Sequence, residues 1–139
     1  TKETQMSNQL EILLLDDELI VGKRLKPALE KIGCHVEVFQ DPLVAMKRIG
    51  EKEFDIVVTD IYMEEMDGMQ VLEMVHDQWP RTKIIMITGY AMISLARDSM
   101  EKGAFDFIAK PFKPDDLRKV IAKAAEALGS PLNFNAPVH

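Results

Sequence analysis

Cysteine is nearly absent from this sequence, which has one, Cys34, among 139 residues. A single cysteine excludes an internal disulfide and a metal site built from several thiolates, and we interpret Cys34 as a small core residue. Long apolar runs are also missing, since none approaches the ~20 residues that a membrane-spanning helix needs. The first residues, TKETQMSNQ, lack the apolar core of a signal peptide. We therefore expect a soluble, cytoplasmic protein that does not enter a membrane.

An excess of basic residues is lacking too. The chain has 17 lysine and arginine residues against 23 aspartate and glutamate residues, and its net charge is −6. Contacts to nucleic acid phosphates need basic surface, so this balance argues against direct nucleic acid binding by this chain. The hydrophobic content of 47% predicts a folded chain, and the length suits one domain with its own core.

Five apolar runs, mostly of β-branched residues, recur at the spacing of a repeated strand–helix unit. They are EILLLDD (11–17), CHVEVF (34–39), FDIVVTD (54–60), KIIMITG (83–89) and FDFIAKP (105–111). Between them, apolar residues at steps of three and four predict helices. Gly33 and Gly103 stand where helices should end, and Pro42 and Pro114 where helices should begin. Pro27 falls inside the first helix, where we expect a bend but no break.

This alternation predicts an α/β fold, in which a five-stranded parallel sheet is covered by helices on both faces. Right-handed crossovers would make it a doubly wound three-layer sandwich. We expect the domain to span residues 10–128, preceded by an N-terminal extension over 1–9. Residues 129–139, GSPLNFNAPVH, lack periodicity and hold two prolines, which indicates a tail or linker stub.

Polar residues stand at or near the end of four of the five runs. In doubly wound sheets, ligands bind at the carboxyl ends of the strands. These residues are Asp16 and Asp17 in the first run, Asp60 in the third, Thr88 in the fourth and Lys110 in the fifth. Crowded carboxylates repel one another unless a cation lies among them, and an all-oxygen ligand set favours Mg²⁺. Lys110 and Thr88 could bind phosphoryl oxygens. The set predicts a phosphoryl-transfer site in which Asp60 is the nucleophile.

Four segments, LLLDDE, DIVVTDIYMEEMDG, MITGYA and FDFIAKPF, resemble the signature segments of bacterial two-component response regulator receiver domains. The resemblance covers about residues 10–128, in the family's order and spacing. It implies a flavodoxin-like fold with strand order 2-1-3-4-5. It also implies a phosphorylation-controlled signalling switch rather than a metabolic enzyme. The implied partners are a sensor histidine kinase or histidine phosphotransfer protein, and a downstream effector protein or domain.

The resemblance further implies roles for the acidic residues. Asp60 would accept a phosphoryl group from a phosphohistidine, and the domain would catalyse its own phosphorylation and dephosphorylation. Asp17 and Asp60 would bind Mg²⁺ directly, together with the backbone carbonyl of Tyr62. Asp16 would bind the ion through water.

A switch is implied by the same resemblance. Thr88 would turn toward the phosphoryl group that Lys110 also binds, and Phe107 would follow it inward. The surface of the fourth helix, fifth strand and fifth helix would change as a result, and a homodimer through this surface is an open alternative. The Lys110–Pro111 peptide bond would be cis.

Three residues near Asp60 distinguish this sequence within the family pattern. Glu64 stands where the family usually has proline, which adds negative charge near the site. Tyr62 and Tyr90, two residues beyond Asp60 and Thr88, are bulky at positions that tune the access of water. Our hypothesis is that the two tyrosines shield the phosphoryl group and slow self-dephosphorylation.

Two other functions remain open on the sequence. A flavodoxin-type cofactor binder would share the fold, although no Gly-, Ser- or Thr-rich phosphate loop follows EILLL. An interaction module that never carries phosphate is the second alternative. A partner could contact Met92, Ile93 and Met100 on the fourth predicted helix.

Overall fold

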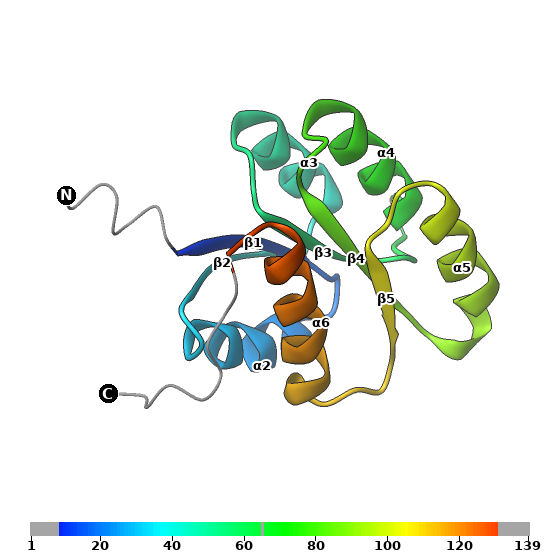
Figure 1. Ribbon diagram of the computed structural model, residues 1–139. Helices are drawn as coiled ribbons and strands as arrows, with labels where there is room; N and C mark the ends of the chain where they lie inside the picture. The colour runs from blue at the N-terminus through cyan, green and yellow to red at the C-terminus, as the bar shows by residue number, and fades with distance from the viewer. Residues whose placement is uncertain (1–8, 65, 131–139) are drawn as a thin grey trace.

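The structure, a computed structural model, describes residues 9–64 and 66–130. In this part of the chain, strands and helices alternate (Figure 1). The elements are β1 (Leu10–Leu15), α2 (Leu19–Glu30), β2 (Cys34–Phe39), α3 (Pro42–Glu51), β3 (Ile56–Asp60), α4 (Gly68–Gln78), β4 (Lys83–Thr88), the short 3₁₀ helix η1 (Tyr90–Met92), α5 (Ile93–Glu101), β5 (Asp106–Ala109) and α6 (Pro114–Ala127). The helices predicted as the first to the fifth are thus α2 to α6.

The strands form one parallel sheet in the order β2-β1-β3-β4-β5, which confirms the predicted fold and strand order. Helices α2 and α6 cover one face, and α3, α4 and α5 cover the other (Figure 1). The register aligns Asp60 with Ile87 and Thr88 with Ala109. The carboxyl ends of the central strands therefore lie at one edge of the sheet, where the predicted site residues follow.

Both faces of the sheet are buried, as continuous apolar strands predict. In β1, Leu13 and Leu15 join the cluster under α3, α4 and α5, whereas Ile12 and Leu14 join the cluster under α2 and α6. All four side chains are fully buried. Burial of this apolar surface on two sides stabilises the layered arrangement and fixes the edge at which the chain leaves each strand.

The helix boundaries follow the predicted signals. Asp41 accepts a hydrogen bond from the backbone N–H of Leu43 at 2.9 Å and caps α3, which begins at Pro42. Gly33 has a φ of 91°, in the left-handed region where glycine costs least. Helix α2 continues without a break past Pro27 to Glu30. The first and last strands end earlier than their apolar runs, at Leu15 and Ala109.

The predicted core position of Cys34 is confirmed, since it is 1% exposed, and burial raises the pKa of its thiol to about 12. Across residues 9–64 and 66–130, no helix has the length and apolar character to cross a membrane. The predicted extension over 1–9 and the tail over 129–139 lie almost wholly outside the described residues, so both stay predictions.

Candidate functional site

Three carboxylates meet at the edge where β1 and β3 end. Asp16, Asp17 and Asp60 each offer an oxygen, and these oxygens lie within 4.8 Å of one another. Asp16 and Asp60 are buried, whereas Asp17 is exposed. The sheet therefore brings together the acidic residues that the sequence placed at two separate strand ends.

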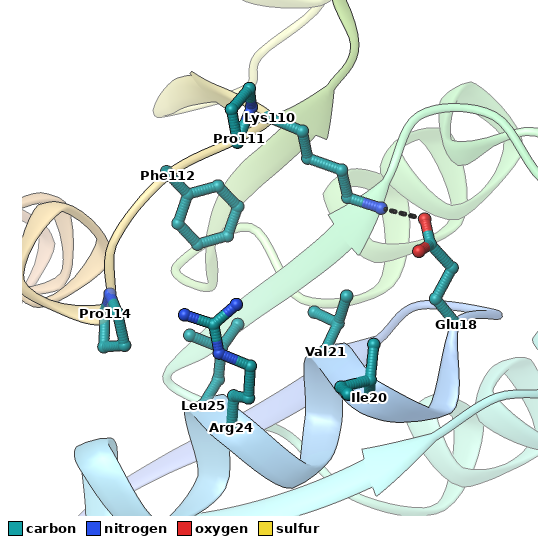
Figure 2. Close-up of a pocket in the computed structure, with 9 residues that line it drawn as sticks. All are labelled: Glu18, Ile20, Val21, Arg24, Leu25, Lys110, Pro111, Phe112 and Pro114. Carbon is teal, nitrogen blue, oxygen red and sulfur yellow. Dashed lines mark hydrogen bonds and ion pairs between the residues drawn. The ribbon is translucent and has the colours of Figure 1, made fainter.

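Lys110, just beyond β5, points into this acidic group. Its Nζ lies 3.0 Å from Asp16 Oδ2, 3.3 Å from Asp60 Oδ2 and 2.8 Å from Glu18 Oε1. Figure 2 shows the contact with Glu18. Burial alone would lower the pKa of Lys110, but the hydrogen bonds to Glu18 and Asp16 outweigh it and raise the pKa. The lysine is therefore a fixed positive charge at the site.

The two oxygens of Asp16 have different partners. Its Oδ1 accepts the backbone N–H of Glu18 at 2.9 Å, and its buried Oδ2 lies 3.0 Å from Lys110 Nζ. Burial raises the pKa of Asp16 and of Asp60, and the hydrogen bonds they accept oppose the rise. Asp16, Asp17 and Asp60 lie together beside one ammonium, and a divalent cation would offset the negative charge that remains. The residues thus fit a hard cation such as Mg²⁺.

The position of Asp60 depends on a close approach of α4. Asp60 Oδ1 accepts the backbone N–H of Tyr62 at 3.1 Å, and Gly68 N–H donates to Ile61 O at 2.8 Å. A Cβ atom on Gly68 would lie 2.4 Å from Asp60 O. Only glycine therefore lets the start of α4 reach the backbone of the Asp60 turn.

Thr88 and Phe107 lie on neighbouring strands, Thr88 at the end of β4 and Phe107 within β5. Thr88 is fully buried, and its Oγ1 donates to Gly89 O at 2.9 Å. Its carbonyl accepts the N–H of Lys110 at 2.7 Å, which joins the ends of β4 and β5. Phe107 is half-buried and packs against the cluster under α3, α4 and α5. The inward movement of both side chains stays a prediction.

The residues predicted to modulate the site have exposed side chains. Tyr62 is 59% exposed and Tyr90 is 75% exposed. Glu64 is exposed and, with Asp17, lines a shallow pocket of about 310 Å³. The Lys110–Pro111 peptide bond is cis, as expected.

Sequence reasoning missed Glu18. This residue follows Asp17 and is the N-cap residue of α2, a position typical of surface glutamates, so its charge pointed to no particular partner. The available signal was that Asp16 to Glu18 are three consecutive acidic residues, whereas the sequence predicted one lysine, Lys110, for the same site. Glu18 and Lys110 also border a pocket of about 410 Å³ together with Phe112 (Figure 2).

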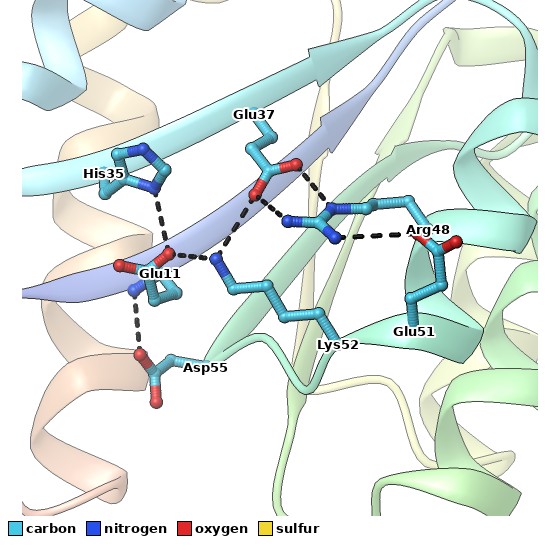
Figure 3. A network of polar contacts seen from close by, with 7 residues as sticks. All are labelled: Glu11, His35, Glu37, Arg48, Glu51, Lys52 and Asp55. Carbon is cyan, nitrogen blue, oxygen red and sulfur yellow. Dashed lines mark hydrogen bonds and ion pairs between the residues drawn. The ribbon is translucent and has the colours of Figure 1, made fainter. Parts of the chain in front are cut away.

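A second cluster lies around Glu11, near the start of β1 (Figure 3). Glu11, His35 and Glu37 offer ligand atoms within 4.8 Å of one another. Lys52 Nζ already contacts Glu11 Oε1 at 2.5 Å and Glu37 Oε2 at 3.2 Å, and Arg48 donates two hydrogen bonds to Glu37. These cations balance the carboxylates, so the cluster ties β1 and β2 to α3 and needs no metal.

Residues 12–122 match the response regulator receiver domain family. This chain belongs to that family. Family membership replaces the flavodoxin-type cofactor binder that the fold alone left open, and it confirms the resemblance seen in the sequence. The receiver domain is the phosphorylation-controlled signalling module of two-component response regulators.

Curated relatives are similar over the same region. A putative NtrX-like response regulator of Rickettsia typhi is 34% identical over 121 residues, which are 86% of this chain and 26% of that protein. The regulatory protein AtoC of Escherichia coli is 32% identical over 115 residues, which are 83% of this chain and 25% of that protein. This chain thus spans about a quarter of the length of these relatives.

Solved structures share the fold. A CheY-like receiver domain protein of Methanospirillum hungatei has a TM-score of 0.82 and 30% identity, covering 87% of this chain and 97% of that one. NtrX of Brucella abortus, in complex with ADP, has a TM-score of 0.81 and 30% identity, covering 87% of this chain and 28% of that one.

Proposed function

We propose that this receiver domain accepts a phosphoryl group on Asp60 and changes its affinity for a partner as a result. The observation that carries the proposal is the convergence of Asp16, Asp17 and Asp60, the first and last of them buried, beside the Lys110 ammonium. One ammonium does not neutralise three carboxylates, so the site keeps an excess of negative charge that a cation would offset. The domain would act as a signalling switch that catalyses its own phosphorylation and dephosphorylation.

The carboxylates would hold Mg²⁺. Asp17 and Asp60 would bind it directly with the carbonyl of Tyr62, and Asp16 would bind it through water. When bound, the ion supplies positive charge that offsets repulsion between the carboxylates and the phosphoryl oxygens. The exposure of Asp17 supports this assignment, because an exposed carboxylate at the mouth of the site is open to a partly hydrated ion.

Asp60 would act as the nucleophile toward a phosphohistidine of a sensor kinase or phosphotransfer protein. A carboxylate oxygen of Asp60 forms a bond to phosphorus while the phosphorus–nitrogen bond breaks, and the imidazole leaves with the electron pair. Lys110 and the Thr88 hydroxyl would bind the oxygens of the transferred group. Attack by water on the phosphorus would return Asp60 and release inorganic phosphate.

Phosphorylation would shift the equilibrium between two existing conformations rather than create a new conformation. Thr88 would exchange its hydrogen bond to Gly89 for one to a phosphoryl oxygen, and Phe107 would move into the space it leaves. The surface of α5, β5 and α6 would change with them. An effector protein or effector domain would bind this surface. The alternative is a homodimer that forms through the same surface.

Incubation with acetyl phosphate tests the proposal by intact mass. Wild type should gain the mass of one phosphoryl group in Mg²⁺ and none after chelation, and Asp60→Asn should gain none. A folded wild-type protein that gains no mass would favour a pure interaction module. A gain that persists in Asp60→Asn would place the phosphoryl group elsewhere.

A further inference from the structure

We infer that Glu18 is a positioning residue, which holds the Lys110 ammonium at the mouth of the site and competes for it with the phosphoryl group. The inference rests on the proposed function and adds a fourth carboxylate to it. Glu18 is not a ligand for the ion or the phosphoryl group in this account. It acts through Lys110 and sets how readily the lysine transfers to the phosphoryl oxygens.

The side chain of Glu18 leaves its own helix to reach Lys110. Glu18 is the N-cap residue of α2, where an acidic side chain could accept the free N–H groups of the first turn, yet it makes no such hydrogen bond. Its Oε1 instead accepts a hydrogen bond from Lys110 Nζ at 2.8 Å, across 92 residues. This is the shortest of the three carboxylate contacts of the lysine.

Asp16 fixes both members of the pair. Its Oδ1 accepts the backbone N–H of Glu18 at 2.9 Å, and its Oδ2 lies 3.0 Å from Lys110 Nζ. The three residues therefore close a ring, from Asp16 to the backbone of Glu18, through its side chain to Lys110, and back to Asp16. The position of the Glu18 carboxylate follows from the site itself rather than from chance contact on the surface.

The ring gives Lys110 two kinds of partner. Asp16 and Asp60 belong to the proposed metal and phosphoryl site, whereas Glu18 lies outside it. When Asp60 carries a phosphoryl group, the lysine must leave Glu18 or share its protons with it to reach the new oxygens. The negative charge of Glu18 also repels the incoming phosphoryl donor, so both effects lower the occupancy of the phosphorylated state.

Release of the lysine is feasible because the Glu18 side of the pair is open to solvent. The Glu18 side chain is 59% exposed, and the pair borders the 410 Å³ pocket that Figure 2 shows. A freed carboxylate there can hydrate without leaving a buried charge. Exposed pairs of this kind contribute little free energy, so Glu18 should tune the equilibrium rather than block it.

Binding of beryllofluoride, a stable mimic of the phosphoryl group, tests the inference in the presence of Mg²⁺. Fluorine NMR would measure its Kd for wild type, Glu18→Gln and Glu18→Asp. We expect Glu18→Gln to bind about two- to fivefold more tightly, the range that an exposed pair allows. Glu18→Asp keeps the charge but withdraws the carboxylate by one methylene, so it should also bind more tightly than wild type.

Glu64→Gln is the matched control for charge alone. It removes one negative charge from the same edge, where Glu64 lies beside Asp17. Any gain it gives should be smaller than that of Glu18→Gln and should persist when combined with Lys110→Ala, whereas the gain of Glu18→Gln should fall in that background to that of Glu64→Gln.

Three outcomes would overturn the inference. They are an unchanged Kd in Glu18→Gln, an equal gain in Glu64→Gln, and a gain in Glu18→Gln that stays undiminished in Lys110→Ala. Each leaves the proposed function intact as long as wild type binds beryllofluoride. A wild-type protein that binds none would instead overturn the proposed function, and the role of Glu18 with it.

Discussion

Lys110 Nζ lies 3.3 Å from Asp60 Oδ2, although 50 residues separate the two in the sequence. They meet because β3 and β5 end at the same edge of the parallel sheet, with β4 between them. The sheet therefore holds a buried cluster of like charges, with one lysine to offset them. Such an arrangement favours ligand binding at the expense of stability.

Asp60→Asn should stabilise the metal-free protein. The change removes a buried carboxylate that repels its neighbours, and we expect a gain of about 1 kcal/mol or more in the free energy of unfolding. Urea unfolding without divalent ions would measure it. The exposed Asp77→Asn should leave stability unchanged, and a loss of stability in Asp60→Asn would contradict the account.

The same variant should change how stability depends on pH. Burial raises the pKa of Asp60 above its ordinary 3.8 in the metal-free protein, so the folded state binds this proton more tightly than the unfolded chain. Its contribution is present in full below 3.8 and is lost as pH rises through the higher folded pKa. The advantage of Asp60→Asn should therefore grow with pH over that window.

Gly68→Ala should destabilise the protein, because its Cβ would lie 2.4 Å from Asp60 O and 2.9 Å from Ile61 Cα. These are backbone atoms that cannot move aside cheaply, so we expect a loss of about 1–3 kcal/mol by thermal or urea unfolding. Gly50→Ala is the matched control. That Cβ would lie 3.7 Å from a flexible methionine end, so about 0.5–1 kcal/mol should be gained.

Tyr62→Ala combined with Tyr90→Ala should shorten the lifetime of phosphorylated Asp60. Both rings are exposed and stand two residues beyond Asp60 and Thr88, and their removal would admit the hydrolytic water more freely. The release of phosphate after removal of the donor measures this lifetime. Tyr62→Phe with Tyr90→Phe keeps the rings and should leave it unchanged. An unaltered lifetime in the double alanine variant would disprove shielding.

Glu37→Gln should lower stability at neutral pH and leave it unchanged in acid. Hydrogen bonds from Arg48, helped by Lys52, lower the pKa of Glu37 below 4.5 despite its partial burial (Figure 3). The ionised form therefore stabilises the folded state above 4.5, and this contribution is lost as pH falls through the folded pKa. Urea unfolding of both proteins over this range would show two curves that converge in acid; parallel curves would contradict it.

Much of the fold was predictable because its signals are local and repeated. A continuous apolar run such as Ile12–Leu15 is typical of a parallel strand that is covered on both faces. Asp41 and Pro42 predict a helix start, because aspartate can accept a free N–H of the first turn and proline has the φ of the first helical position. Strand ends were less certain. The run 105–111 includes Lys110 and Pro111, but β5 ends at Ala109. The types of residue in a run do not show where backbone pairing between strands stops.

The site was predictable where its residues end strands, and less so elsewhere. Asp16, Asp60 and Lys110 follow apolar runs, so the topology alone brings them together. Glu18 was missed because its partner depends on a side-chain direction that spacing does not encode. The role of Gly68 depends on an approach of two backbone segments, which residue types alone do not reveal.

The most direct measurement is to locate the phosphoryl group itself. Borohydride converts an aspartyl phosphate to homoserine, which tandem mass spectrometry can assign to one position after treatment with acetyl phosphate and Mg²⁺. The account predicts homoserine at position 60 and an unmodified chain when Mg²⁺ is chelated. Homoserine at position 16 or 17 instead, or none in a folded protein, would contradict the assignment of Asp60 as the phosphoryl acceptor.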